Sequence, residues 1–169
     1  MADSELIGTA QALLDLCQRK GLKIAAAESC TGGLLTATLT EIPGSSDVVD
    51  RGFVTYSNDA KIAMLGVPAS TLKQRGAVSR ETAEAMARGA LAESGVDLAV
   101  SITGIAGPGG ATAGKPVGLV HLAATARDGR IVHHQRNFGD IGRAQVRRAC
   151  VLEALDMLLG LARTSAPDV

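Results

Sequence analysis

The sequence predicts an α/β fold, a three-layer α/β/α sandwich on a mixed, mostly parallel sheet. Short apolar runs typical of buried strands alternate with segments of helical periodicity. An Asp128-Gly129 turn between two strand-like segments indicates a hairpin near the carboxyl end of the chain. The 169 residues match one domain, and no linker or low-complexity tract divides them. We therefore expect a single domain over 1–169, with a frayed tail at 164–169.

In the amino-terminal half, helices and strands alternate. The expected elements are a helix at 4–20, a strand at 22–27, a helix at 34–40, a strand at 51–56 and a helix at 60–65. Asp3 or Ser4 can cap the first helix, and Gly21 ends it. Residues 22–27 form a nearly continuous apolar run, as in a strand buried on both faces. Residues 57–59 offer caps for the helix that follows the second strand.

The carboxyl-terminal half begins with helices and ends with a hairpin and one long helix. The expected elements are a helix at 68–76, a helix at 80–94, a strand at 97–102, strands at 117–126 and 130–138, and a helix at 143–162. Ser79 caps the helix at 80–94, and Gly95 ends it. The last helix is amphipathic, and Asp140 is its expected cap.

The composition excludes several classes of protein. Hydrophobic residues make up 46% of the chain, which excludes disorder, yet aromatic residues make up only 2%. The three aromatic residues, Phe53, Tyr56 and Phe138, are too few for base-stacking platforms. Seventeen basic and 17 acidic residues give a net charge of zero, so no field attracts nucleic acid or an anionic membrane.

The cysteines and the amino-terminal residues indicate which cellular compartment and which cysteine chemistry to expect. Cys17, Cys30 and Cys150 are odd in number and widely spaced, which indicates neither a zinc site nor a disulfide framework. Cys17 and Cys150 fall in helical patterns and are expected in the core. The first residues carry acids rather than a basic leader, and no stretch has the length of a membrane span. We expect a cytoplasmic protein with no metal or cofactor and no membrane or nucleic-acid partner.

One candidate binding site is the turn between the first strand and the next helix. Ser29, Thr31, Gly32 and Gly33 lie in this turn. Backbone N–H groups at a helix start favour an anion, and the two glycines allow close approach of a ligand. Plain capping of the helix by Thr31 is an equally good interpretation of the same residues.

A second candidate is the Gly-rich loop at 104–110. It follows Thr103 at the carboxyl end of a predicted strand, where ligands usually bind in α/β sheets. Four glycines in seven residues exceed the needs of a tight connector to the hairpin, so a binding role for this loop, including Gly104 and Gly107, is favoured.

Ser46, Tyr56 and Lys61 form a third group. Ser46 lies in a loop, Tyr56 ends a predicted strand and Lys61 lies near the start of the next helix. A helix start and burial both favour the neutral amine that a general base needs, and serine with lysine is a known nucleophile–base pair. Spacing alone nevertheless favours a turn serine and a solvated surface lysine.

Arginines open the last predicted helix. Arg143 and Arg147 are four residues apart and share a face, and Arg148 follows. Arginine forks bind phosphate bidentately, so this face is a candidate phosphate site. A solvated helix face is an equally good interpretation.

Several of these segments occur in the order found in one known family. They are AESCTGG at 27–33, GSS at 44–46, RGFVTYSNDAK at 51–61, GAVS at 76–79, SITGIAGPGG at 101–110, KPVG at 115–118 and FGD…R at 138–143. Together they resemble the CinA carboxy-terminal domain over nearly the whole chain. Stand-alone members of that family are nicotinamide mononucleotide deamidases, whereas larger members carry an additional amino-terminal domain.

The resemblance implies a metal-free Ser/Lys amidohydrolase. Its reaction hydrolyses the carboxamide of nicotinamide mononucleotide to nicotinate mononucleotide and ammonia, which recycles the pyridine ring in NAD metabolism. Carried onto this chain, Ser46 is the nucleophile, Lys61 is its general base and Tyr56 assists the proton relay.

The resemblance also implies the residues that bind the substrate. Ser29 and Thr103 line the pocket, and Arg143 contacts the substrate at the phosphate. This sequence departs from the family at one point, because Ile141 and Gly142 separate Asp140 from Arg143.

Two other functions remain open at this point. A non-catalytic module that binds pyridine nucleotides would keep the same pocket. A thiol mechanism would use Cys30, whose place at a helix start lowers its pKa. We also expect a homo-oligomer, although the sequence identifies no interface.

Overall fold

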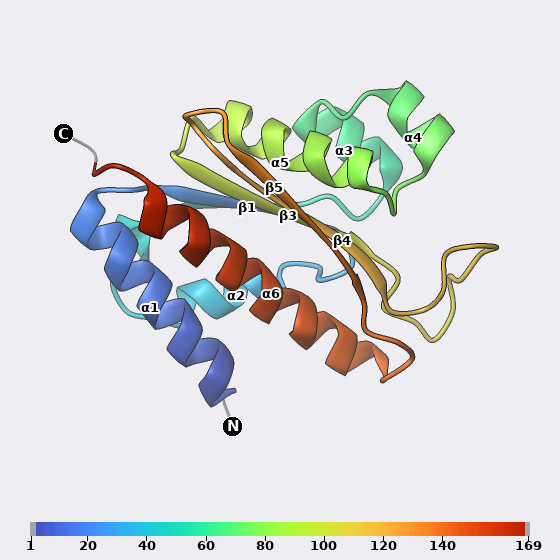
Figure 1. Ribbon diagram of the computed structural model, residues 1–169, viewed down its shortest axis with the longest axis horizontal. Coiled ribbons are helices and arrows are strands. Elements are labelled where there is room, and N and C mark those ends of the chain that lie inside the picture. The colour runs from blue at the N-terminus through green and yellow to red at the C-terminus, as the bar shows by residue number, and fades with distance from the viewer. Residues whose placement is uncertain (1–2, 168–169) are drawn as a thin grey trace.

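The computed structural model describes residues 3–167 and shows a three-layer α/β/α sandwich, as predicted (Figure 1). Its five-stranded mixed sheet has the order β2-β1-β3-β4-β5. In chain order the elements are α1 (Ser4–Lys20), β1 (Ile24–Glu28), α2 (Leu34–Thr40), the 3₁₀ turn η1 (Ser45–Asp47), β2 (Val49–Val54), α3 (Asn58–Leu65), α4 (Ala69–Arg75), α5 (Arg80–Ser94), β3 (Leu98–Gly104), β4 (Leu119–Ala126), β5 (Ile131–Asn137) and α6 (Arg143–Thr164).

The segments that follow β1, β2 and β3 leave the sheet at the same edge, because these three strands run in the same direction. Strand β1 is parallel to both β2 and β3, whereas β4 and β5 are added antiparallel. Glu28, the last residue of β1, lies in register with Val54 of β2 and Ile102 of β3. Because these carboxyl ends coincide, the segments that follow the three strands lie close together. This is the usual ligand position in an open α/β sheet.

Helices cover both faces of the sheet. Helices α1, α2 and α6 lie on one face, and α3, α4 and α5 lie on the other (Figure 1). Small residues fill the layer between the sheet and α5, where Ala83 and Ala87 of α5 pack on Ala123 of β4. Cys17 and Cys150 are fully buried between α1, α6 and the sheet, as predicted. Among residues 3–167, no helix is both long and apolar enough to cross a membrane.

The element boundaries differ from the predictions where tertiary pairing decides them. Strand β2 ends at Val54 rather than at Tyr56, because the chain turns there toward the Ser57 cap of α3. Strand β3 continues to Gly104, because β4 pairs with it along that whole length. The residue that caps α6 is Gly142 rather than Asp140. Its φ of 94° is a left-handed conformation that favours glycine.

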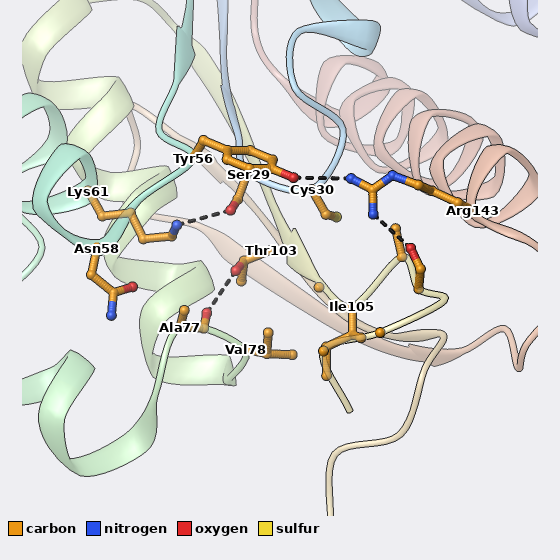
Figure 2. Close-up of a pocket in the computed structure, with 15 residues that line it drawn as sticks. Ser29, Cys30, Tyr56, Asn58, Lys61, Ala77, Val78, Thr103, Ile105 and Arg143 are labelled. Carbon is orange, nitrogen blue, oxygen red and sulfur yellow. Dashed lines mark hydrogen bonds between the residues drawn. The ribbon is translucent and has the colours of Figure 1, made fainter. Parts of the chain in front are cut away.

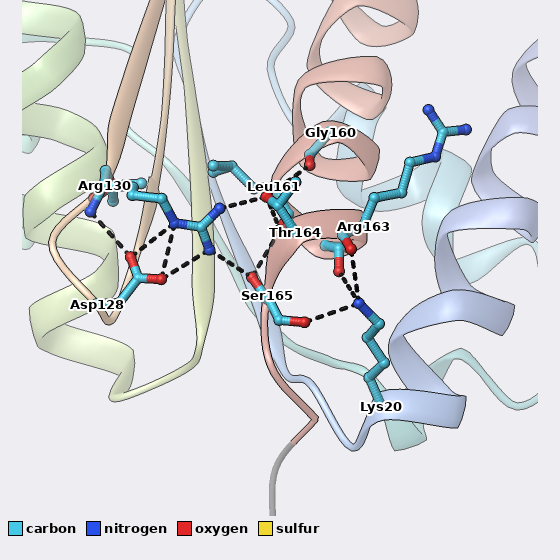
Figure 3. Close-up of polar contacts among 10 residues, drawn as sticks. Lys20, Asp128, Arg130, Gly160, Leu161, Arg163, Thr164 and Ser165 are labelled. Carbon is cyan, nitrogen blue, oxygen red and sulfur yellow. Dashed lines mark hydrogen bonds and ion pairs between the residues drawn. The ribbon is translucent and has the colours of Figure 1, made fainter.

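The end of α6 is held by α1 instead of being frayed from residue 164 (Figure 3). Lys20 Nζ donates hydrogen bonds to the carbonyl oxygens of Ala162, Arg163 and Ser165 at 2.8, 3.0 and 2.8 Å. A lysine at a helix carboxyl end satisfies free carbonyl groups and complements the helix dipole. Helix α6 therefore includes Thr164, at which the frayed tail was predicted to begin, and residues 168–169 lie outside the described chain.

Candidate functional site

A cavity of about 290 Å³ lies at the edge of the sheet where β1, β2 and β3 end (Figure 2). Its walls come from segments far apart in the sequence. The chemically useful side chains among them are Ser29 and Cys30 after β1, Tyr56 after β2, Asn58 and Lys61 of α3, Thr103 of β3 and Arg143 of α6. Backbone of the 104–110 loop closes another side of the cavity.

Ser29 and Lys61 form the polar centre of this cavity. Lys61 Nζ lies 3.0 Å from Ser29 Oγ and 2.8 Å from the carbonyl oxygen of Thr55. Lys61 is only 1% exposed, although it lies on a short helix. Burial lowers the pKa of its ammonium group, and the neighbouring Cys30 opposes this shift in part. The arrangement therefore places an amine that readily becomes neutral beside a serine hydroxyl.

Lys61 owes its direction to the way α3 begins. Ser57 Oγ accepts a hydrogen bond from Ala60 N at 3.0 Å, so the helix starts directly after β2. One turn later Lys61 and Leu65 face inward, and Leu65 packs in the core beneath α5. The cap thus sets the helical phase that turns the lysine toward Ser29.

The structure does not bring Ser46 and Lys61 together. Ser46 is exposed and lies in η1, directly before β2, whereas Lys61 lies after β2. A six-residue strand spans about 20 Å, so the two residues are at opposite edges of the sheet. The structure therefore does not place the predicted nucleophile Ser46 beside Lys61. The hydroxyl beside Lys61 belongs to Ser29, which had been expected only to line the pocket.

Tyr56 and Arg143 form a second polar pair at the mouth of the cavity (Figure 2). Arg143 Nη2 donates to Tyr56 Oη at 3.1 Å, and Arg143 Nη1 donates to the carbonyl oxygen of Gly107 at 2.7 Å. Within residues 3–167, Tyr56 Oη bonds neither to Ser29 nor to Lys61, so the predicted proton relay is not formed. Tyr56 is 64% exposed and instead orients the guanidinium group.

Arg143 reaches the cavity despite the two residues that separate it from Asp140. It is the first residue of α6, and the amino-terminal end of this helix meets the Gly-rich loop. Arg147, one turn further along, instead donates to the carbonyl oxygen of Thr31 at 2.9 Å. Arg148 pairs with Asp3 and Glu5 of α1. Of the three arginines, only Arg143 lines the cavity.

Thr103 lies near the carboxyl end of β3, and the 104–110 loop that follows lines the cavity. Thr103 Oγ1 donates to the carbonyl oxygen of Ala77 at 2.7 Å, which ties the strand end to the connection before α5. A Cβ atom at Gly104 would lie 2.7 Å from Val120 Cγ2, and one at Gly107 would lie 2.6 Å from Val117 Cγ1. Both glycines are therefore needed for the close packing of this loop.

The rest of the turn after β1 does not line the cavity. Thr31 is fully buried. Gly32 and Gly33 directly precede α2, and neither lines the cavity. The start of α2 is occupied by the chain's own carboxylate, because Glu28 accepts hydrogen bonds from the backbone N–H groups of Leu35 and Thr36. The predicted anion site at Thr31, Gly32 and Gly33 is therefore filled from within the protein.

Sequence reasoning missed Glu28 and Asn58. Asn58 opens α3 and lines the cavity, but its position suggested only a helix cap. Glu28 directly follows the apolar run at 22–27 and has no predicted role. An acidic residue between a buried strand and a helix start is a usable signal, because the carboxylate finds free N–H groups there.

Comparison with known proteins shows the family of this chain. A model of the CinA C-terminal domain matches residues 7–162. The chain is 52% identical over 119 residues to the nicotinamide-nucleotide amidohydrolase PncC of Enterobacter agglomerans, which covers 70% of this chain and 73% of that protein. It is 49% identical over 150 residues to a CinA-like protein of Parasynechococcus marenigrum, covering 88% of this chain but only 36% of that protein.

A solved structure shows the same architecture. The competence/damage inducible protein CihA from Agrobacterium tumefaciens is 55% identical, with a TM-score of 0.94 over 95% of this chain and 98% of that chain. Many of the curated relatives are longer, and the chain spans little more than a third of their length. With the family model matched over nearly all of its length, this chain belongs to the CinA C-terminal domain family.

Proposed function

We propose that this chain hydrolyses the carboxamide of nicotinamide mononucleotide, giving nicotinate mononucleotide and ammonia. The observation that carries the proposal is the 3.0 Å contact between the buried Lys61 amine and the Ser29 hydroxyl inside a cavity. The name of the Enterobacter agglomerans relative, a nicotinamide-nucleotide amidohydrolase, supports the substrate class. The reaction would return the pyridine ring to NAD metabolism.

The Ser29–Lys61 pair supplies the nucleophile and the base. The neutral Lys61 amine takes the proton from Ser29 Oγ as this oxygen attacks the carboxamide carbon. A tetrahedral intermediate forms, and the Lys61 ammonium returns the proton to the amide nitrogen, so ammonia leaves and an acyl ester remains on Ser29. Lys61 then deprotonates a water molecule that hydrolyses this ester, which releases the nicotinate product and restores Ser29.

Other groups around the cavity match the remaining needs of the reaction. The oxyanion requires fixed N–H donors, which the backbone of the 104–110 loop can supply at the cavity wall. The 5′-phosphate requires a cation. Lys61 and Arg143 are the basic side chains that line the cavity, and Lys61 serves as the base, so we assign the phosphate to Arg143.

Ammonia release from purified protein tests the proposal. We expect turnover of nicotinamide mononucleotide, with loss of activity in Ser29→Ala and in Lys61→Met. Cys30→Ala is the matched control, because Cys30 lines the same cavity beside Ser29. Full activity in Ser29→Ala, or inactivity of Cys30→Ala with a native fold, would contradict the Ser29 mechanism. Tight binding of the nucleotide in calorimetry without ammonia release would instead indicate a non-catalytic binding module.

A further inference from the structure

Glu28 is a fully buried carboxylate directly before Ser29. Its Oε1 accepts a hydrogen bond from Leu35 N at 2.8 Å. Its Oε2 accepts from Thr36 N at 3.0 Å and from Thr36 Oγ1 at 2.8 Å. Both oxygens therefore have hydrogen-bond partners, and the first turn of α2 satisfies this buried side chain.

The main chain of Glu28 also connects to the lysine. The carbonyl oxygen of Glu28 accepts a hydrogen bond from Thr55 N at 2.8 Å, and the carbonyl oxygen of Thr55 accepts from Lys61 Nζ at 2.8 Å. The next residue, Ser29, is tied to β3 through its own N–H, which donates to Ile102 O at 3.0 Å. One residue therefore joins α2, the nucleophile turn and the segment that holds the base.

Burying the Glu28 side chain costs free energy, which indicates that its contacts have a structural role. A buried carboxylate loses its hydration, and hydrogen bonds to it mainly offset that loss. The Ser29 turn itself contains Gly32 and Gly33 with φ angles of 55° and 99°, so its backbone has few intrinsic restraints. Glu28 precedes this turn and α2 follows it, so the hydrogen bonds from α2 to the Glu28 carboxylate hold the two ends of the turn together.

We propose that Glu28 is a positioning residue that holds Ser29 Oγ at the Lys61 amine. The inference rests on the proposed function of the Ser29–Lys61 pair. Glu28 does not line the cavity, so it acts through Ser29 and not on the substrate. Its loss should therefore lower kcat while leaving the KM for nicotinamide mononucleotide nearly unchanged.

Glu28→Gln is the first test. The amide NH₂ group faces an N–H donor where the carboxylate oxygen accepted a bond, so the turn loosens without a change in side-chain size. Because a misplacement of about 1 Å can cost about 100-fold in rate, we expect kcat to fall about 10- to 100-fold. KM should change by less than about 3-fold, since substrate-binding groups are untouched. Wild-type kcat in a folded Glu28→Gln variant would overturn the proposal.

A matched pair on α2 keeps the test decisive if Glu28→Gln fails to fold. Thr36→Val removes one hydrogen bond to Glu28 and leaves the two backbone bonds. Thr38→Val removes a hydroxyl that donates to Leu34 O in the same helix, and this hydroxyl is not among the hydrogen-bond partners of Glu28. We expect kcat to fall several-fold in Thr36→Val and to stay at the wild-type value in Thr38→Val. Equal kcat values in these two variants would overturn the proposal.

The rate at which a fluorophosphonate labels Ser29 does not depend on the substrate, so it tests this proposal separately from the proposed function. A fluorophosphonate forms a bond from phosphorus to Ser29 Oγ, fluoride leaves, and Lys61 takes the hydroxyl proton. The rate, followed by intact mass, reports how well Ser29 is placed. Slow labelling of Glu28→Gln relative to wild type supports positioning even if wild type releases no ammonia, which would overturn only the proposed function. Equal labelling rates would overturn the positioning role.

Discussion

Lys61 Nζ lies 3.0 Å from Ser29 Oγ although 32 positions separate the two residues. The contact exists because β1 and β2 are parallel neighbours, so the turn after β1 and the helix after β2 start at the same edge of the sheet. Lys61 is buried there by Ser29, the Thr55 carbonyl and the α3–α5 packing. This burial lowers the pKa of the Lys61 ammonium group.

The pH dependence of the reaction should report Lys61. Burial lowers the pKa of its ammonium group below 10.5, and only the neutral amine can accept the Ser29 proton. The value of kcat/KM for nicotinamide mononucleotide should therefore rise with pH through a limb that ends below pH 10.5. A pH–rate profile measures this, and a rising limb that inflects at or above pH 10.5 would contradict a buried base.

Replacing each serine should show which one reacts. Ser29→Ala removes the hydroxyl beside Lys61, and we expect a loss of about 1000-fold or more in kcat. Ser46→Ala alters an exposed residue at the opposite edge of the sheet, and we expect kcat within about 2-fold of wild type. Both variants are assayed by ammonia release. The reverse pattern would restore Ser46 as the nucleophile.

Arg143 should contribute to binding of the phosphate and not to the chemical step. Loss of a charge-assisted contact costs about 1.5–3 kcal/mol, so we expect Arg143→Met to raise the KM for nicotinamide mononucleotide about 10- to 100-fold. The kcat should change little. Nicotinamide riboside, which lacks the phosphate, is the control, and its kcat/KM should be nearly equal in wild type and Arg143→Met. A parallel loss with the riboside would exclude this phosphate contact.

Two helical glycines should respond to alanine with opposite signs. A Cβ atom at Gly89 of α5 would lie 2.0 Å from Leu65 O of α3, whereas one at Gly160 of α6 meets nothing within 4 Å. The clash outweighs the gain in helix propensity, so Gly89→Ala should lower the free energy of unfolding by about 1–3 kcal/mol. Gly160→Ala should raise it by about 0.5–1 kcal/mol. Urea unfolding of both variants measures this difference.

The stability of the protein should fall in mild acid partly through His121. Burial lowers the pKa of His121 to about 4, and the nearby His133, whose Nε2 lies 2.9 Å from His121 Nδ1, acts in the same direction. The unfolded chain binds a proton near pH 6.5, whereas the folded one binds it near pH 4. Stability from this group is therefore complete above pH 6.5 and declines as the pH falls toward 4.

Urea unfolding at several pH values tests the role of His121. Its contribution to the slope is at most about 1.4 kcal/mol per pH unit. His121→Gln cannot titrate, so its free energy of unfolding should depend less steeply on pH between 6.5 and 4. An unchanged slope in this variant would assign the acid sensitivity to other groups.

The sequence by itself determined the elements and most of the residues around the cavity. Periodicity and caps located α1, α2 and α5 with the boundaries that the structure shows. Lys61, Thr103 and the 104–110 loop could be predicted because each lies at or soon after the carboxyl end of a strand, where ligands bind in α/β sheets. These inferences use only local spacing and a general rule about α/β sheets.

Only the tertiary structure decided which hydroxyl meets Lys61 and what fills the start of α2. Ser46 precedes its strand and Ser29 follows its own, so parallel pairing sends them to opposite edges of the sheet. Glu28 reaches two N–H groups seven and eight residues further along only because the chain folds back into α2. The spacing of residues along the chain does not reveal how the strands pair. The direction of the paired strands decides which side chains line the same cavity.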